Sequence, residues 1–121
     1  MKLYTYDIGS QTFEIYVGTN AKENWKLIDN SDPFDLWFHL DEFPSGHVII
    51  KEKLDKNKVN GIESELIYPN QIISLAANHC KSQSKYKDRT KLKIVYTQIA
   101  KLKKGKEIGS VIISDPKYLF I

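Results

Sequence analysis

The chain has 121 residues, enough for one domain with a hydrophobic core, and we expect a single domain over residues 1–121. Hydrophobic residues make up 41% and charged residues 27%, values typical of globular proteins. No apolar run is long enough to cross a bilayer, and the first residues lack the apolar segment of a signal peptide. The one cysteine, Cys80, excludes an intramolecular disulfide and a cysteine-based metal cluster. Together these features predict a cytoplasmic protein.

The formal net charge of +3 is distributed unevenly along the chain. Residues 1–80 carry 7 basic and 12 acidic side chains, whereas residues 81–106 carry 10 basic side chains against the single Asp88. Almost all the basic residues are lysines, and Arg89 is the one arginine. A chain polarised in this way presents a strongly positive region to its surroundings, and nucleic acid is the polyanion that such a region most often meets.

The first third of the chain predicts a β-hairpin followed by a short helix. Polar and apolar side chains alternate in residues 2–8 and 12–18, and both segments are rich in aromatic and β-branched types. Gly-Ser-Gln between them is expected to form the turn. Asn20 is expected to cap a helix over residues 21–28, and Glu23 stands three positions later, as in a capping box.

Residues 35–41 and 46–53 predict a second hairpin around a Pro-Ser-Gly turn. Because successive side chains of a strand point to opposite faces, directly opposed residues must share a face. One pairing register places apolar residues opposite apolar residues and an acidic residue opposite a basic one. Its pairs are Phe38 with Val48, Leu36 with Ile50, Trp37 with Ile49, His39 with His47, and Asp35 with Lys51.

The remainder predicts one longer helix and three further strands. Residues 54–64 are polar and contain Gly and Asn, which indicates a loop. Pro69 suits the first turn of a helix, and apolar residues at helical spacing continue to about residue 82. Strands are expected over residues 92–98, 110–114 and 117–121, with a basic segment over 99–106. Without a βαβ rhythm, the fold class is α+β, with an antiparallel, hairpin-rich sheet and one long and one short helix.

His39 and His47 are the first candidates for chemistry, and three interpretations compete. An RNA- or nucleotide-processing enzyme could use them as an acid–base pair, but it would need a nucleophile and an orienting group, for which Ser45, Asp35 and Asp41 are close in sequence. A zinc site usually has three or four ligands, and only two imidazoles are offered. The third interpretation is that both rings pack near Trp37 and shape a binding face. We favour this one and expect no catalytic residue, metal or cofactor.

Two lysine-rich clusters flank the predicted strand over residues 92–98, converging at its two ends or on one face. Phosphates attract such clusters through counterion release, and aromatic side chains such as Tyr86 can stack on unpaired bases. Lysine supplies charge rather than forked hydrogen bonds, so this surface would read backbone and shape more than sequence. A solvated lysine face without a partner is the competing interpretation. The predicted nucleic-acid contacts are Lys81, Lys85, Lys87, Arg89, Lys91, Lys101, Lys103 and Lys104.

An ordered series of short motifs covers nearly the whole chain. In order, it consists of Gly18, Asn20 and Asn24; Asp35, Trp37, Phe38 and His39; Pro44, Ser45, Gly46, His47 and Val48; Ala76-Ala77; Val95-Tyr96-Thr97; and Leu102-Lys103-Lys104 followed by Gly109. In these motifs the chain resembles the NFACT RNA-binding (NFACT-R) domain. That domain is a C-terminal module of ribosome-quality-control and fibronectin-binding-like proteins, and it also exists as stand-alone proteins.

The resemblance implies an RNA-binding module with tRNA or ribosomal RNA as its ligand, linked to ribosomes and to translation quality control, and without enzymatic activity. Its motif face would consist of Asp35, Trp37, His39 and His47, beside the lysine-rich surface. Stand-alone relatives in eukaryotes carry a long charged C-terminal helix, and we expect a stand-alone member without it. A DNA-binding module and a protein-interaction module remain open as alternatives, since a lysine surface discriminates poorly between nucleic acids.

Overall fold

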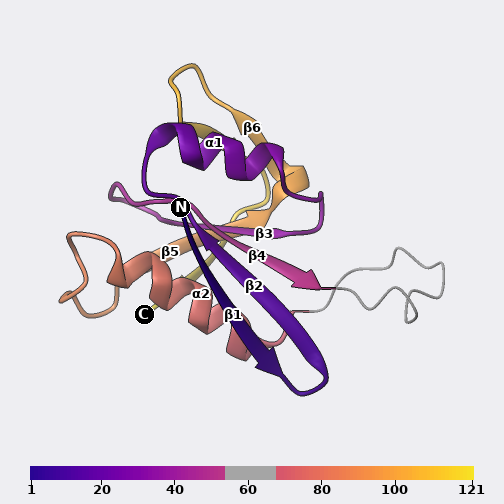
Figure 1. Cartoon of the computed structure of the whole chain (residues 1–121). Coiled ribbons are helices and arrows are strands. Elements are labelled where there is room, and N and C mark those ends of the chain that lie inside the picture. Colours follow the sequence, from indigo (N-terminus) through magenta and orange to yellow (C-terminus); the bar gives the residue numbers. More distant parts are fainter. Residues whose placement is uncertain (54–67) are drawn as a thin grey trace.

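The computed structural model describes residues 1–53 and 68–121. Within them, six strands form one antiparallel sheet in the order β1-β2-β4-β3-β5-β8 (Figure 1). The α+β class and both predicted hairpins are confirmed, and the predicted loop over residues 54–64 lies outside the described residues. The elements of this sheet and its two α-helices are β1 (Lys2–Ile8), β2 (Gln11–Val17), α1 (Ala21–Asp29), β3 (Leu36–Leu40), β4 (Val48–Lys53), α2 (Asn70–Ser82), β5 (Lys93–Gln98) and β8 (Lys117–Phe120).

The register predicted for the second hairpin is the observed one. Phe38 pairs with Val48, and the neighbouring pairs follow from it. At the open end of the hairpin, the Lys51 ammonium lies 3.3 Å from the Asp35 carboxylate. At the turn end, His39 meets His47 with 5.4 Å between ring centroids, although His47 itself lies just outside β4. Apolar pairing in the centre and charge pairing at the end therefore determine this alignment together.

The two faces of the sheet are covered by different elements (Figure 1). Helix α2 packs on one face, and its buried residues include Ala76, Ala77 and Cys80, so small side chains let the helix approach the strands closely. Burial raises the pKa of the Cys80 thiol, in keeping with its predicted place in the core. On the other face, α1 contributes Leu27 to a second cluster around Trp37. In the described residues, no helix is long and apolar enough to cross a membrane.

The basic segment predicted over residues 99–106 contains structure that its sequence did not indicate. It begins with a 3-10 helix, η2 (Ile99–Lys101), and continues as strand β6 (Leu102–Lys104). Strand β6 pairs antiparallel with β7 (Val111–Ile113) in a separate two-stranded sheet. Three lysines around one leucine give no strand pattern, so the pairing depends on apolar residues of β7, which pack with Leu102 against the Trp37 cluster.

Helix α1 starts where the sequence predicts, with one change in its capping. The Asn20 side chain accepts a hydrogen bond from the backbone N–H of Glu23 at 2.9 Å. The Glu23 carboxylate reaches one residue further back than in a capping box and accepts hydrogen bonds from both the backbone N–H and the hydroxyl of Thr19. Side chains therefore satisfy one free donor of the first turn of α1 and the N–H of Thr19 just before it.

We predict that Asn20→Ala lowers the free energy of unfolding by about 1 kcal/mol, because the Glu23 N–H loses its acceptor. Asn30→Ala is the matched control, since Asn30 stands at the other end of the same helix and caps it through its backbone. Urea denaturation of both variants measures the difference. Equal losses in the two variants would show that the Asn20 cap does not stabilise the helix start.

Candidate nucleic-acid interface

Residues from distant parts of the chain line one cavity of about 480 Å³ at the turn end of the β3–β4 hairpin. We call it the signature cavity. Its walls come from the start of α1 (residues 19–21 and Asn24), the connection of β3 to β4 (residues 44–47), the loop after α2 (residues 83–86), residues 108–109, and His39 of β3. Motif residues that are far apart in the sequence therefore meet at one place, among them Asn20, Asn24, His39, Pro44, Ser45, Gly46, His47 and Gly109.

Close backbone approach explains the glycines of this cavity. The Gly18 N–H donates to the His47 carbonyl at 2.9 Å. A Cβ atom on Gly46 would lie 2.1 Å from the Gly18 carbonyl oxygen, and one on Gly18 would lie 2.1 Å from the amide oxygen of Asn24. That same amide oxygen accepts the backbone N–H of His47 at 3.1 Å in a buried hydrogen bond. The Gly-x-Asn and Pro-Ser-Gly-His motifs thus hold each other in place.

The two histidines are uncharged members of this cavity at neutral pH. His47 is only 2% exposed, and burial lowers its pKa to about 3, with a smaller contribution from the neighbouring His39. Burial also lowers the pKa of His39. The Nδ1–H of His39 donates to the Leu40 carbonyl at 2.6 Å, which sets its tautomer. Neutral imidazoles offer hydrogen-bonding groups without adding charge.

The arrangement around Ser45 does not resemble a nucleophile–base pair. Its hydroxyl donates to the Gly46 carbonyl and accepts the Leu40 N–H, both at 3.2 Å, so it braces the turn. Among the residues that the structure describes, no hydrogen bond joins the Ser45 hydroxyl to a histidine, and no group of three metal-binding side chains occurs. This geometry serves to shape the turn rather than to activate an attacking oxygen.

Trp37 and Asp35 share the histidine face of the hairpin but lie outside the cavity wall. Trp37, 1% exposed, stacks on His39 with 5.7 Å between ring centroids and meets His47 edge-on at 5.1 Å. Asp35 is buried at the far end of β3, where it pairs with Lys51. Of the predicted motif face, only His39 and His47 line the cavity, with Trp37 supporting both rings from behind.

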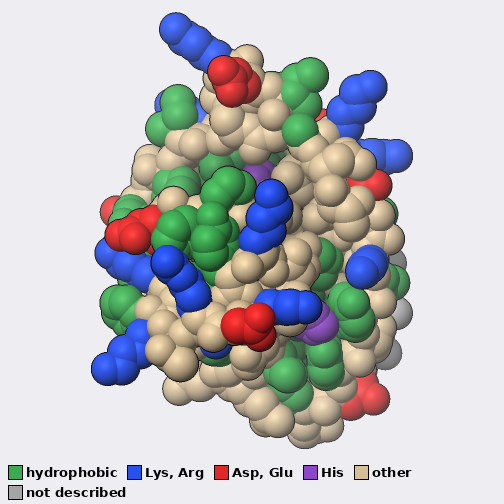
Figure 2. Space-filling model, turned by 90° about the vertical axis from the view of Figure 1, so that its left-hand side faces the viewer, with side chains coloured by type: hydrophobic (Ala, Val, Ile, Leu, Met, Phe, Trp, Pro, Cys, Tyr) green, Lys and Arg blue, Asp and Glu red, His purple; other side chains and the backbone are tan. Residues whose placement is uncertain are grey.

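The first basic cluster lies beside the signature cavity, in the loop between α2 and β5 that we call the basic loop (residues 83–92). Lys85 and Tyr86 line the cavity directly. The Tyr86 ring stacks on Phe43 at 4.1 Å, and the Arg89 guanidinium lies over both rings, 4.9 Å from Phe43 and 5.5 Å from Tyr86. Lys87 is exposed on the same loop. Figure 2 shows this side of the molecule, where lysine and arginine side chains, with a few acidic ones, lie around hydrophobic and histidine side chains.

The other predicted contacts are placed differently. Lys101 pairs with Asp115 at 3.4 Å, and Lys104 pairs with Asp29 at 2.6 Å and lies over the Trp25 ring. These lysines follow the C-terminal end of β5, whereas the basic loop precedes its N-terminal end. The predicted set therefore divides between the two ends of the strand, and two of its members are already paired with acids. Lys91 and Lys103 are exposed, and Lys81 donates to the Ile121 carbonyl.

A family model described as the NFACT protein RNA-binding domain matches residues 2–115 of the chain. The chain belongs to this family. Membership makes it an RNA-binding module in general terms, and the match covers the segments that build the signature cavity.

Curated relatives and one solved structure agree with this assignment. Coiled-coil domain-containing protein 25 from Mus musculus is 31% identical over 99 residues, 80% of this chain and 44% of the relative. Its homolog from Dictyostelium discoideum is 33% identical over 110 residues, 84% of this chain and 48% of the relative. This NFACT-R domain thus spans about half the length of these relatives. The C-terminal part of the fibronectin/fibrinogen-binding protein from Streptococcus suis shares the fold, with a TM-score of 0.77 at 23% identity, covering all of this chain and 45% of that one.

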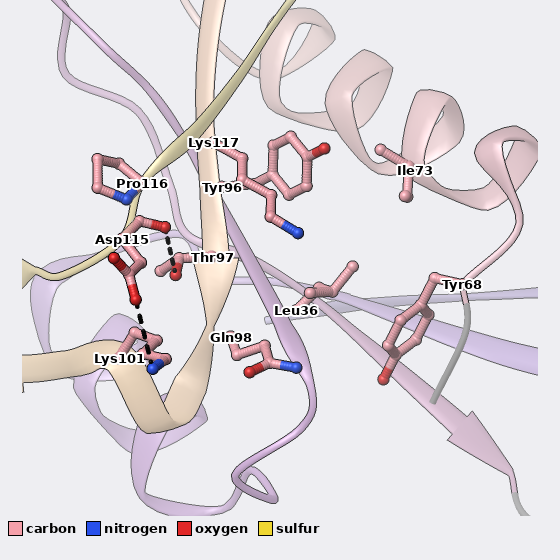
Figure 3. Close-up of a pocket in the computed structure, with 10 residues that line it drawn as sticks. All are labelled: Leu36, Tyr68, Ile73, Tyr96, Thr97, Gln98, Lys101, Asp115, Pro116 and Lys117. Atoms are coloured by element: carbon pink, nitrogen blue, oxygen red, sulfur yellow. Dashed lines mark hydrogen bonds and ion pairs between the residues drawn. The ribbon is translucent and has the colours of Figure 1, made fainter. Parts of the chain in front are cut away.

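A larger cavity of about 720 Å³ lies elsewhere on this NFACT-R domain (Figure 3). It is lined by Tyr96 and Thr97 of β5, by the Lys101–Asp115 ion pair and by parts of α2 and β8. The Thr97 hydroxyl bonds to backbone carbonyls at Ser114 and Asp115, so this polar group of the cavity wall already has partners within the chain. Of the motif residues, only those of β5 contribute to it. For this reason the smaller signature cavity is the better candidate site in this family member.

Three cavity residues were missed by the sequence analysis, and two of them carry no signal that would have marked them. Gln83 donates from its amide to the Gly46 carbonyl at 3.1 Å, and Ser84 accepts the Tyr86 N–H. Both are ordinary polar residues of a loop. Ile108 offers a weak signal, because a lone isoleucine stands in the polar stretch Gly-Lys-Glu-Ile-Gly.

Acid should destabilise this NFACT-R domain through His47. Below the ordinary histidine pKa of 6.5, the unfolded chain takes up a proton that the folded chain binds only near pH 3, so stability falls as the pH falls through this window. The slope from one such histidine approaches about 1.4 kcal/mol per pH unit. The His47→Gln variant lacks this pH-dependent contribution. The difference in the free energy of unfolding between wild type and variant should therefore become smaller as the pH falls.

Urea denaturation at several pH values between 7 and 4 measures this gap. His79→Gln is the control, because burial lowers the pKa of His79 as well but its ring is only partly buried, so the gap should narrow less. Parallel stability curves for His47→Gln and wild type would contradict the assignment of a neutral His47.

Proposed function

We propose that this domain binds structured RNA, tRNA or ribosomal RNA, in the cytoplasm as part of translation, and that the basic loop makes the main phosphate contacts. The observation that carries the proposal is the position of one loop: its Lys85 and Tyr86 line the signature cavity, and its Arg89 lies over the Tyr86 ring. Membership of an RNA-binding family supports RNA as the class of ligand.

The charges of the basic loop are available to an incoming polyanion. Among the described residues, no carboxylate pairs with Lys85, Lys87, Arg89 or Lys91, and Asp88 is the one acid of the loop. Phosphates that replace counterions around such side chains contribute affinity without base specificity. Arg89 is already oriented by Phe43 and Tyr86, so less side-chain entropy is lost when it binds a phosphate.

Lys101 and Lys104, which follow β5 and are paired with acids, should contribute less to RNA binding. A phosphate that approaches Lys101 or Lys104 must compete with Asp115 or Asp29 and is repelled by the same carboxylate. Lys103 lies between them and points to solvent without such a partner in the described part of the chain. We therefore place the main contact surface on the basic loop, with Lys103 as a secondary contact.

The double variant Lys85→Ala/Lys87→Ala tests this surface. Fluorescence anisotropy of a labelled tRNA across a salt series should show weaker binding and a salt slope about 1.5 to 2 units shallower, because two phosphate contacts are lost. The control variant Lys101→Ala/Lys104→Ala removes the same charge and should change the slope by less than about 1 unit. The affinity for a DNA of the same sequence, measured in parallel, shows whether the domain prefers RNA or DNA.

Three outcomes decide the proposal. A larger effect in the basic-loop variant supports the assigned surface. Equal effects in the two variants would divide the surface between both ends of β5, and a larger effect in the control would move it to the other end; either result would contradict the basic loop as the main contact. Wild-type affinity that does not depend on salt would contradict phosphate-driven RNA binding altogether.

A further inference from the structure

We propose that the signature cavity receives one unpaired nucleobase of the bound RNA, beside the phosphates held by the basic loop. This inference rests on the proposed function and deepens it, because it assigns the cavity a ligand that fully paired RNA cannot supply. The volume of about 480 Å³ falls in the range of pockets that take small organic ligands.

The lining of the cavity is mostly uncharged, which suits a neutral group. Its lining contains one permanent cation, Lys85, and no carboxylate. At the start of α1, where a phosphate would otherwise bind, the Glu23 carboxylate already accepts the Thr19 N–H at 3.0 Å. The same carboxylate also pairs with the N-terminal ammonium at 2.7 Å, so the rim carries little net charge and an uncharged base can lie beside it.

Hydrogen-bonding groups remain available inside this wall. The Asn20 side chain uses its oxygen to cap α1, and the Gln83 side chain uses its nitrogen to bond the Gly46 carbonyl. Among the described residues, the remaining amide nitrogen of Asn20 and amide oxygen of Gln83 have no partner. One free donor and one free acceptor match the edge of a nucleobase, which carries both kinds of group.

Apolar surface suited to a base comes from two different loops. Ile108 is 56% exposed although it lines the cavity, and no packing contact of the core accounts for it. The Tyr86 ring is held on Phe43, so its orientation at the cavity is set before any ligand arrives. Unpaired bases that leave a helix are bound by stacking on such aromatic and apolar side chains.

The test uses two RNAs with the same stem, one a blunt duplex and one carrying a single unpaired nucleotide at its 3′ end. Wild-type protein should bind the RNA with the overhang roughly tenfold more tightly in fluorescence anisotropy. Ile108→Ala should reduce this preference to about twofold or less, while leaving affinity for the blunt duplex and its salt slope unchanged. Gln83→Met, which removes the amide but keeps the length of the side chain, should reduce it by several-fold.

Matched controls separate the cavity from general effects. Ile112→Ala changes the same residue type at a similar exposure of 61% on β7, outside the cavity, and should keep the full preference. Gln71→Met is the corresponding control for Gln83→Met, because it makes the same substitution at an exposed position on α2 and should keep the full preference. Thermal unfolding of each variant confirms that these surface changes leave the fold intact.

The outcomes distinguish the two proposals. Equal wild-type affinity for both RNAs, with normal salt dependence, would overturn the nucleobase pocket and leave the proposed function standing. The same loss of preference in Ile112→Ala would also overturn it. If neither RNA bound in a salt-dependent way, the proposed function would fail, and the pocket with it.

Discussion

The buried hydrogen bond from the His47 N–H to the Asn24 amide oxygen is the joint on which the rest of the site depends. It ties helix α1 to the connection between β3 and β4, beside the hydrogen bond from the Gly18 N–H to the His47 carbonyl. The close approach of Gly46 to the Gly18 carbonyl completes the joint, since a side chain at Gly46 would force the two segments apart and one at Gly18 would displace the Asn24 amide. The signature cavity is the space that this joint leaves between α1, the hairpin and the basic loop.

Around this joint, burial governs the chemistry of the histidines. Trp37 occupies the centre of the second core cluster and contacts both imidazole rings, so neither ring is surrounded by water. A buried imidazole resists protonation, and the two rings at 5.4 Å from each other would repel if both were charged. A pair of histidines that looks like acid–base machinery in the sequence is therefore a neutral, oriented wall in the folded domain.

Electrostatics are divided between the two ends of β5. The basic loop keeps its cations free next to the cavity, whereas Lys101 and Lys104 neutralise Asp115 and Asp29 and connect the small sheet to its surroundings. Exposed ion pairs of this kind contribute little stability, but they reduce the charge that a distant phosphate experiences. The ten basic residues over 81–106 therefore form a smaller and better defined positive region in the folded domain than their number along the chain suggests.

Local and pairwise information in the sequence determined much of this protein. Alternation in residues 36–40 and 48–53 was enough to predict the register of the central hairpin, because a slip of one residue would expose its apolar side. The Asn20 cap and the helical spacing up to Cys80 predicted both helices for the same reason, since each depends on residues within a few positions. Only the tertiary structure decided that β6 pairs with β7, that Gln83 and Ile108 enter the cavity, and that Lys104 is paired with Asp29. Those contacts join residues that are distant in sequence or carry no periodic pattern, so their positions follow from how the elements pack and not from any one segment.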